Sequence, residues 1–267
     1  MDTKALKQFC EDTWDRDIIP ALQDYIRIPA KSPVFDADWE TNGHIEKAAQ
    51  LAADWCRKHA LPGMQMEIHR LPGRTPLLFM EIPGTIEDAV NKPCILFYGH
   101  LDKQPEVDGW HEDLGPWKPV IQDGKLYGRG GADDGYAVFS SLAAIRAVHE
   151  QNIPHARCVI VIELCEESGS LDLSHHFKAL AERIGTPDLV VCLDAECGNY
   201  DQFWCTTSLR GNLVGTLSVD ILTEGVHSGS AGGVVPSSFT IIRHLLDRVE
   251  DSSNGFIKLS VMQVNIP

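Results

Sequence analysis

The chain has 267 residues, of which 43% are hydrophobic and 23% are charged. This composition is that of a globular protein with a buried core, and it excludes a chain that is disordered or fibrous throughout. The formal net charge is −15, and such an excess of carboxylates repels nucleic-acid phosphates and anionic membrane surfaces. We therefore expect no nucleic acid and no membrane among the partners.

The N-terminal residues and the cysteines indicate where the protein works. Residues 1–7 contain no apolar stretch of the kind that a secretory signal requires. The eight cysteines are scattered without CxxC spacing, and several of them lie in apolar runs. This pattern favours free thiols in a reducing compartment over a disulfide framework. We therefore expect a cytoplasmic protein.

Helical and strand-like patterns alternate up to about residue 205. Hydrophobic residues recur every three or four positions in predicted helices at residues 4–28, 42–61, 135–151 and 171–183. Short apolar runs predict strands at residues 64–71, 76–82, 94–99, 158–164 and 189–194. Such alternation is typical of an α/β fold with a mixed, mostly parallel sheet flanked by helices.

The pattern changes after residue 206. Residues 212–222 alternate as in a strand with one exposed face, residues 236–249 have the pattern of an amphipathic helix, and residues 257–264 are strand-like again. We therefore expect two domains, a larger one over residues 1–205 and the beginning of a smaller α/β domain over residues 206–267.

Polar side chains stand at the carboxyl ends of three predicted strands. Right-handed crossovers bring the ends of parallel strands to one edge of a sheet, where sites in open α/β sheets lie. The side chains concerned are His100, Asp102, Glu166, Glu167 and Asp194. We expect them to share one site.

The segment from His100 to Asp102 can place an imidazole beside a carboxylate. The carboxylate then holds one ring nitrogen, and the other nitrogen faces a metal. Taken alone, the pattern is more typical of a histidine at the surface or one whose hydrogen bonds are satisfied in the core.

The glycine-rich turn at residues 128–135 contains Asp133 and Asp134. Two carboxylates at a helix start repel phosphate, and GxGxxG is absent, so the turn is not a typical phosphate-binding loop. Capping of the following helix accounts for one of the two acids and leaves the other unexplained.

Glu166 and Glu167 are adjacent carboxylates after an apolar strand. If they face one cleft, they raise each other's pKa unless a cation lies between them. One of them could then bind a metal while the other transfers protons; a solvated loop is the alternative. One imidazole and several carboxylates suit Zn²⁺ or Mn²⁺ in an open catalytic site.

Two further patterns carry less weight. His227 and Ser228 resemble a nucleophile pair, but adjacent side chains rarely face each other and no orienting acid is evident. Cys192 and Cys197 could be metal thiolates, although a pair at this spacing is more typical of core packing.

Four motifs occur together in the order Tyr98–Pro105, Trp110, Leu126–Gly135 and Glu166–Ser170, with His100 and Asp133 33 positions apart. In this combination the chain resembles the dizinc aminoacylase/carboxypeptidase/dipeptidase family. The similarity is greatest to the cytosolic nonspecific dipeptidase and carnosinase branch. The resemblance implies a phosphorylase/hydrolase-like catalytic domain over residues 1–205 and a lid domain that forms a homodimer.

The resemblance also implies two Zn²⁺ ions in a complete site, with Mn²⁺ or Co²⁺ as alternatives. The implied metal ligands are His100, Asp133, Glu167 and Asp194. Asp133 would bridge the two ions, and its peptide bond to Asp134 would be cis.

Three more residues receive roles from the resemblance. Asp102 would orient His100, and Glu166 would be the general base. His227 would reach the site of a partner subunit and stabilise the oxyanion.

Two departures from the family pattern affect what we expect of this chain. Gly135 and Tyr136 stand where a lysine usually follows the two acids. Family members also continue well beyond residue 267 and supply a final histidine ligand there. We therefore expect an N-terminal part with weak metal binding and little activity.

The expected activity is hydrolysis of the amide bond in dipeptides or small peptides. An N-acyl amino acid deacylase and a non-catalytic truncated module are the alternatives.

Overall fold

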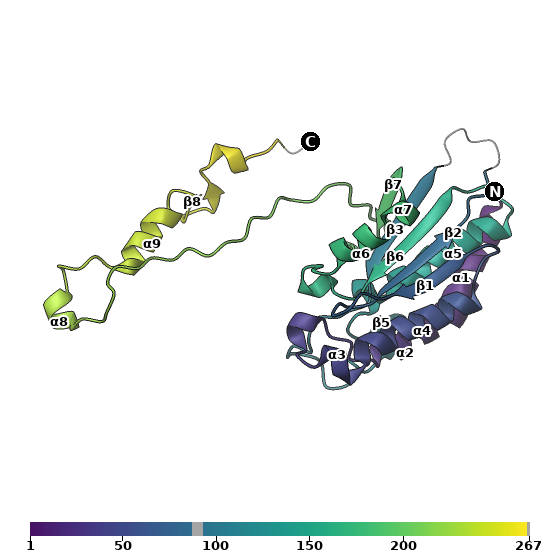
Figure 1. The fold of residues 1–267 in the computed structure, drawn as a ribbon, viewed down its shortest axis with the longest axis horizontal. Coiled ribbons are helices and arrows are strands. Elements are labelled where there is room, and N and C mark those ends of the chain that lie inside the picture. Colours follow the sequence, from purple (N-terminus) through teal and green to yellow (C-terminus); the bar gives the residue numbers. More distant parts are fainter. Residues whose placement is uncertain (87–92, 266–267) are drawn as a thin grey trace. The chain divides into compact units, whose positions relative to one another are not determined.

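The computed structural model describes residues 1–86 and 93–265. The chain divides into two compact units, Met1–Cys205 and Thr206–Pro267. The first unit is a sheet covered by helices on both faces (Figure 1). Among the described residues, no helix is both long and apolar enough to cross a membrane.

The central sheet has the strand order β1-β2-β6-β3-β7. Its strands are β1 (Gln65–His69), β2 (Leu77–Ile82), β3 (Cys94–His100), β6 (Arg157–Glu163) and β7 (Leu189–Cys192). β2 is antiparallel to both β1 and β6, whereas β3 is parallel to both β6 and β7. The predicted α/β class and mixed sheet are therefore confirmed, and the three strands that carry site residues all run parallel.

The helices of the first unit match the predicted helical segments, except for the short α3, which was not predicted. They are α1 (Thr3–Thr13), α2 (Ile19–Ile26), α3 (Trp39–Asn42), α4 (His44–Lys58), α5 (Tyr136–Glu150), α6 (Leu173–Ala179) and α7 (Ala181–Ile184). A π-helical turn at Trp14–Ile18 joins α1 to α2, so the predicted helix over 4–28 is nearly continuous. Pro20 lies in the first turn of α2, directly after this π-helical turn.

A small hairpin was not predicted. It consists of β4 (Val120–Gln122) and β5 (Lys125–Tyr127). Its turn is Asp123-Gly124, with positive φ at both residues. This dipeptide is a strong signal for a two-residue hairpin turn, and it was available in the sequence.

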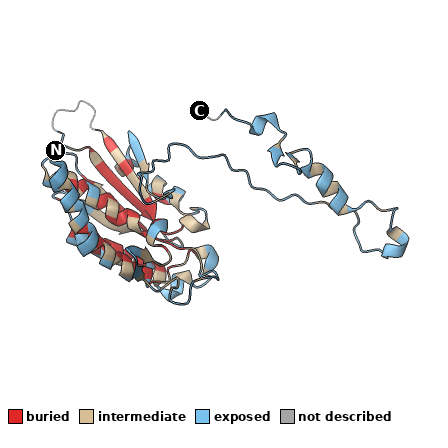
Figure 2. Cartoon of the chain, turned by 180° about the vertical axis from the view of Figure 1, so that it is seen from behind, coloured by how far each residue is buried: buried red, intermediate tan, exposed pale blue. Residues whose placement is uncertain are grey.

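The core lies on both faces of the sheet because side chains alternate along β2 and β6. Leu78, Met80 and Ile82 of β2 pack with α2, α4 and α5 in the larger cluster. Leu77 and Phe79 point to the other face and pack with Leu180 and Ile184. Figure 2 shows this burial along the central strands and the inner sides of the helices.

The second unit contains little regular structure. Its elements are α8 (Ser228–Ala231), α9 (Ser238–Leu246), β8 (Glu250–Asp251), β9 (Phe256–Ile257) and a 3₁₀ turn at Ser260–Met262. The helix predicted over 236–249 is present as α9. The strands predicted over 212–222 and 257–264 are wrong, apart from the two residues of β9. An alternating pattern forms a strand only when a neighbour pairs its backbone, and residues 212–222 have no such neighbour among the described residues.

Candidate metal centre

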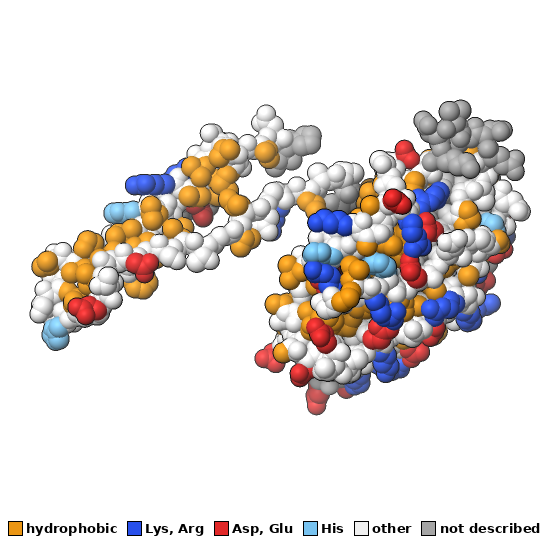
Figure 3. Space-filling model, viewed as in Figure 1, with side chains coloured by type: hydrophobic (Ala, Val, Ile, Leu, Met, Phe, Trp, Pro, Cys, Tyr) orange, Lys and Arg blue, Asp and Glu red, His pale blue; other side chains and the backbone are white. Residues whose placement is uncertain are grey.

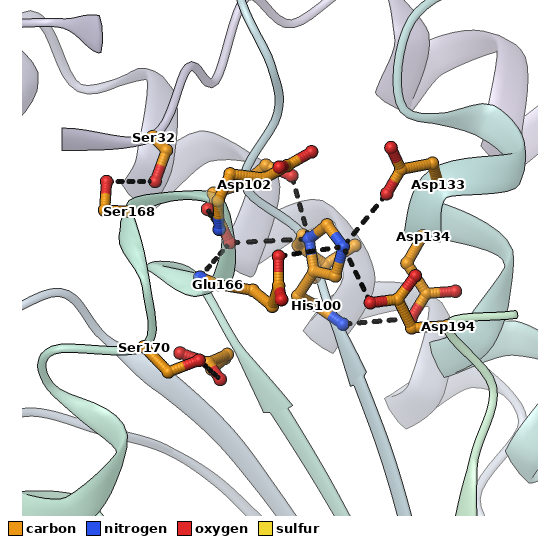
Figure 4. A network of polar contacts seen from close by, with 12 residues as sticks. Ser32, His100, Asp102, Asp133, Asp134, Glu166, Ser168, Ser170 and Asp194 are labelled. Carbon is orange, nitrogen blue, oxygen red and sulfur yellow. Dashed lines mark hydrogen bonds and ion pairs between the residues drawn. The ribbon is translucent and has the colours of Figure 1, made fainter. Parts of the chain in front are cut away.

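His100 lies at the carboxyl end of β3 and is fully buried. Its Nδ1 is 3.0 Å from the backbone oxygen of Asp102. Its Nε2 is 3.2 Å from Asp133 Oδ1 and 3.9 Å from both Glu166 Oε2 and Asp194 Oδ2 (Figure 4). If Nδ1–H donates to the Asp102 carbonyl, the lone pair of Nε2 faces three carboxylates and can bind a cation.

Asp102 contacts both the imidazole of His100 and the backbone that follows β6. Its Oδ1 is 3.5 Å from His100 Nδ1, but its shorter contacts are with the backbone after β6. The N–H groups of Glu166 and Glu167 each donate to one oxygen of Asp102 at 3.0 Å. The side chain is fully buried. Asp102 therefore fixes the turn that presents the two glutamates, a contact between distant segments that the sequence did not indicate.

The glycine-rich turn brings Asp133 to the imidazole and buries Asp134. The peptide bond between them is cis, as the family resemblance implied. Asp134 Oδ2 accepts a hydrogen bond from the backbone N–H of His100 at 3.2 Å. A Cβ at position 99 would lie 2.6 Å from this oxygen, so only Gly99 leaves room for the turn beside β3.

Glu167 is held by Gln104, a residue that the sequence analysis did not single out. The amide Nε2 of Gln104 donates to Glu167 Oε2. The other oxygen, Oε1, is buried and has no partner among the described residues. Gln104 follows Asp102 by two positions, so the segment after β3 contacts both glutamate positions.

The cluster contains far more acid than base. Burial alone would lower the pKa of His100, but hydrogen bonds to Asp102 and Asp133 raise it to about 11. Burial raises the pKa of Glu167 to about 7 and that of Asp134 to about 8. It also raises the pKa of two further carboxyl groups, Glu166 and Asp194. A divalent cation would neutralise this excess of negative charge.

Two sets of side chains can offer ligand atoms that all lie within 4.8 Å of one another. They are His100 with Asp133 and Asp194, and His100 with Glu166 and Glu167. Oδ1 of Asp134 and Oε1 of Glu167 are buried oxygens without a partner in the described part of the chain, and the donor atoms are those that Zn²⁺ and Mn²⁺ prefer. The residues present therefore fit a divalent metal.

The remaining candidates lie apart from these sets. His227 belongs to the second unit, where its Nδ1 accepts a hydrogen bond from the N–H of Gly229 at 3.1 Å. Its role stays a prediction. Cys192 and Cys197 are exposed and belong to neither ligand set within the described residues.

Comparison with known proteins shows which family model the part of the chain around this site matches. Residues 96–219, which contain all five side chains of the two ligand sets, match the model of Peptidase family M20/M25/M40. The chain is related to the M20 peptidases. It is 32% identical over 171 residues to Beta-Ala-His dipeptidase of Rattus norvegicus, covering 62% of this chain and 34% of that protein. The predicted family resemblance is confirmed.

Two more curated relatives differ in the bond that their names indicate. Cys-Gly metallodipeptidase dug1 of Schizosaccharomyces pombe is 28% identical over 183 residues, covering 64% of this chain and 37% of that protein. Succinyl-diaminopimelate desuccinylase of Nitrosomonas europaea is 26% identical over 222 residues, covering 79% of this chain and 57% of that protein. The chain thus spans about a third of the length of the two dipeptidases.

Solved structures support the fold. Human carnosine dipeptidase 1 matches with a TM-score of 0.60 and 21% identity, over 97% of this chain and 54% of that chain. Di-peptidase Dug1p of Saccharomyces cerevisiae matches with a TM-score of 0.58 and 24% identity, again over 97% of this chain and 54% of that chain.

Proposed function

We propose that this chain carries the metal-binding part of a hydrolase that cleaves the amide bond of dipeptides or small peptides. The observation that carries the proposal is the convergence of carboxylates from three separate segments on Nε2 of His100. The printed names of the dipeptidase relatives support the substrate class.

The donor set supports two zinc ions, for which Mn²⁺ or Co²⁺ could substitute. His100 and Asp194 would hold one ion and Glu167 the other, with Asp133 between them. When bound, the ions would activate a water molecule and polarise the substrate carbonyl.

The chain's own residues would handle the protons and the geometry. Glu166 would take a proton from the attacking water and pass it to the leaving amine. Its carboxyl group is one-third exposed, and burial raises its pKa, which moves a carboxyl group toward the range of an effective general base near neutral pH. Asp102 would keep Nε2 of His100 directed at the centre. His227 of a partner subunit would donate a hydrogen bond to the oxyanion.

Association through residues 206–267 is part of the proposal. No described residue of this unit is buried, and large apolar side chains are exposed along it (Figure 3). Examples are Leu213, Val214, Phe239 and Val261, each at least 75% exposed. Covering such surface in a homodimer would remove it from water. All eight cysteines are free, which agrees with the proposed cytoplasmic location.

Hydrolysis and metal content together test the function. Ala-Ala and a carnosine-type dipeptide are compared with N-acetyl amino acids as substrates, with added Zn²⁺ or Mn²⁺. We expect slow dipeptide turnover, because the chain spans only part of the length of its relatives. We expect zinc binding that is weak but approaches two equivalents at saturating metal. Faster cleavage of the N-acetyl compounds would favour the deacylase, which the desuccinylase relative supports. No bound zinc at saturating metal would contradict both activities and favour a non-catalytic module.

A further inference from the structure

Lys103 is a fully buried lysine that no part of the proposed reaction uses. It follows Asp102, and its side chain runs to the carboxyl end of α2. Its Nζ donates to the backbone oxygens of Tyr25 and Ile28 at 2.8 Å each, and it lies 3.4 Å from that of Ile26. An ammonium group has three N–H donors, and three backbone carbonyls at and just after the end of α2 accept from it.

Tyr25 completes a reciprocal connection. The ammonium of Lys103 lies 3.8 Å from the centre of the Tyr25 ring, a cation–π contact. The Tyr25 hydroxyl donates to the backbone oxygen of Leu101 at 2.9 Å. The end of α2 and the segment 101–103 are therefore joined in both directions, on either side of Asp102.

The glycine-rich turn packs against this pair. A Cβ at Gly130 would lie 2.6 Å from Cε of Lys103, and one at Gly135 would overlap the ring of Tyr25. These glycines flank Asp133 and Asp134. The position of the turn relative to His100 thus depends on where the lysine stem and the tyrosine ring lie.

The residues after α2 also contact the turn that carries Glu166 and Glu167, which is the third segment of the metal centre. The N–H of Ser32 donates to the backbone oxygen of Lys103 at 2.9 Å. Oγ of Ser32 is 2.5 Å from Oγ of Ser168, the residue that follows Glu167 (Figure 4). The N–H of Val34 also donates to Ser168 at 2.9 Å.

We propose that Lys103 is a positioning residue of the metal centre: by holding the end of α2, it sets the separation of the segments that carry His100, Asp133 and Glu167. The inference rests on the proposed metal centre. Among the described residues, the hydrogen bonds of the Lys103 side chain go to backbone oxygens, and its ammonium lies over the Tyr25 ring. It therefore acts through the backbone and through Tyr25.

The test replaces Lys103 by methionine, which keeps the length of the stem and removes the three donors. Phe79→Leu is the control, because Phe79 is equally buried but packs in the cluster on the opposite face of the sheet. Zn²⁺ affinity is measured by calorimetric titration of the 267-residue chain, under conditions where urea denaturation shows both variants folded. The ¹⁵N resonances of the His100 ring are recorded without metal.

We expect Lys103→Met to weaken zinc binding by about 10- to 100-fold, the usual effect of removing a partner outside the ligands themselves. The His100 ring resonances should shift, whereas Phe79→Leu should change neither quantity. If Lys103→Met does not fold, Tyr25→Phe removes only the bond to Leu101 and should shift the same resonances to a smaller extent.

Unchanged affinity and unchanged His100 resonances in the folded variants would overturn the inference. If the unmodified chain binds no zinc but the resonances shift, the proposed function fails while the positioning of His100 by Lys103 stands.

Discussion

Asp102→Asn tests whether the Asp102 carboxylate holds the turn with Glu166 and Glu167 in place or only fills buried space. The carboxylate is buried and accepts two backbone hydrogen bonds at 3.0 Å, from the N–H groups of Glu166 and Glu167. An asparagine keeps one acceptor oxygen and turns an NH₂ donor toward the other N–H. One charge-assisted bond is therefore lost and the second becomes a neutral one.

The magnitude follows from these two contacts. A hydrogen bond to a charged group contributes about 1.5–3 kcal/mol, and a neutral one about 1 kcal/mol. We therefore expect the free energy of unfolding to fall by about 3 kcal/mol. Because the turn that carries Glu166 and Glu167 is released, zinc affinity should also fall by about 10- to 100-fold.

Urea denaturation measures the first quantity and calorimetric zinc titration the second. Asp108→Asn is the matched control, since Asp108 is exposed in the segment that follows and its replacement should change stability by no more than about 0.5 kcal/mol. A variant of Asp102 that is as stable as this control and binds zinc as the unmodified chain does would refute the reasoning.

Three further substitutions test other parts of the account. Burial opposes ionisation of Asp172, but hydrogen bonds from Thr75 and Arg74 lower its pKa below 3.8. The ionised carboxylate therefore stabilises the fold fully above that pH, and this stabilisation is lost as the pH falls below it. Asp172→Asn should reduce the acid-dependent loss of stability that urea denaturation measures between pH 5 and 2. Gly99→Ala would place a Cβ 2.5 Å from that of Ala137, and thermal denaturation should show a loss of about 1–3 kcal/mol. Glu166→Gln should retain zinc by elemental analysis but slow Ala-Ala hydrolysis by about 10²- to 10⁴-fold.

The sequence predicted those features that depend on local pattern. Apolar runs indicated β3, β6 and β7, and their parallel order brings His100 beside Glu166 and Asp194. The sequence also indicated which of these side chains would lie close together, because the carboxyl ends of parallel strands lie at one edge of a sheet.

The contacts between distant segments were not predictable in this way. The bonds from Asp102 to the backbone after β6 span 64 and 65 positions, and Lys103 reaches back more than 70 positions to α2. Nothing in the sequence near Lys103 indicates a buried ammonium. The strand predicted over 212–222 failed for a related reason, because alternation describes one face of a strand but not whether a partner strand exists.

Zinc K-edge X-ray absorption of the metal-loaded chain tests the central claim most directly. We expect a first shell of nitrogen and oxygen only, at about 2.0–2.2 Å, with the imidazole signal of one histidine that is lost in His100→Ala. Sulfur scattering at about 2.3 Å, which a thiolate such as Cys192 or Cys197 would give, would contradict it. An imidazole signal that persists in His100→Ala would contradict it equally.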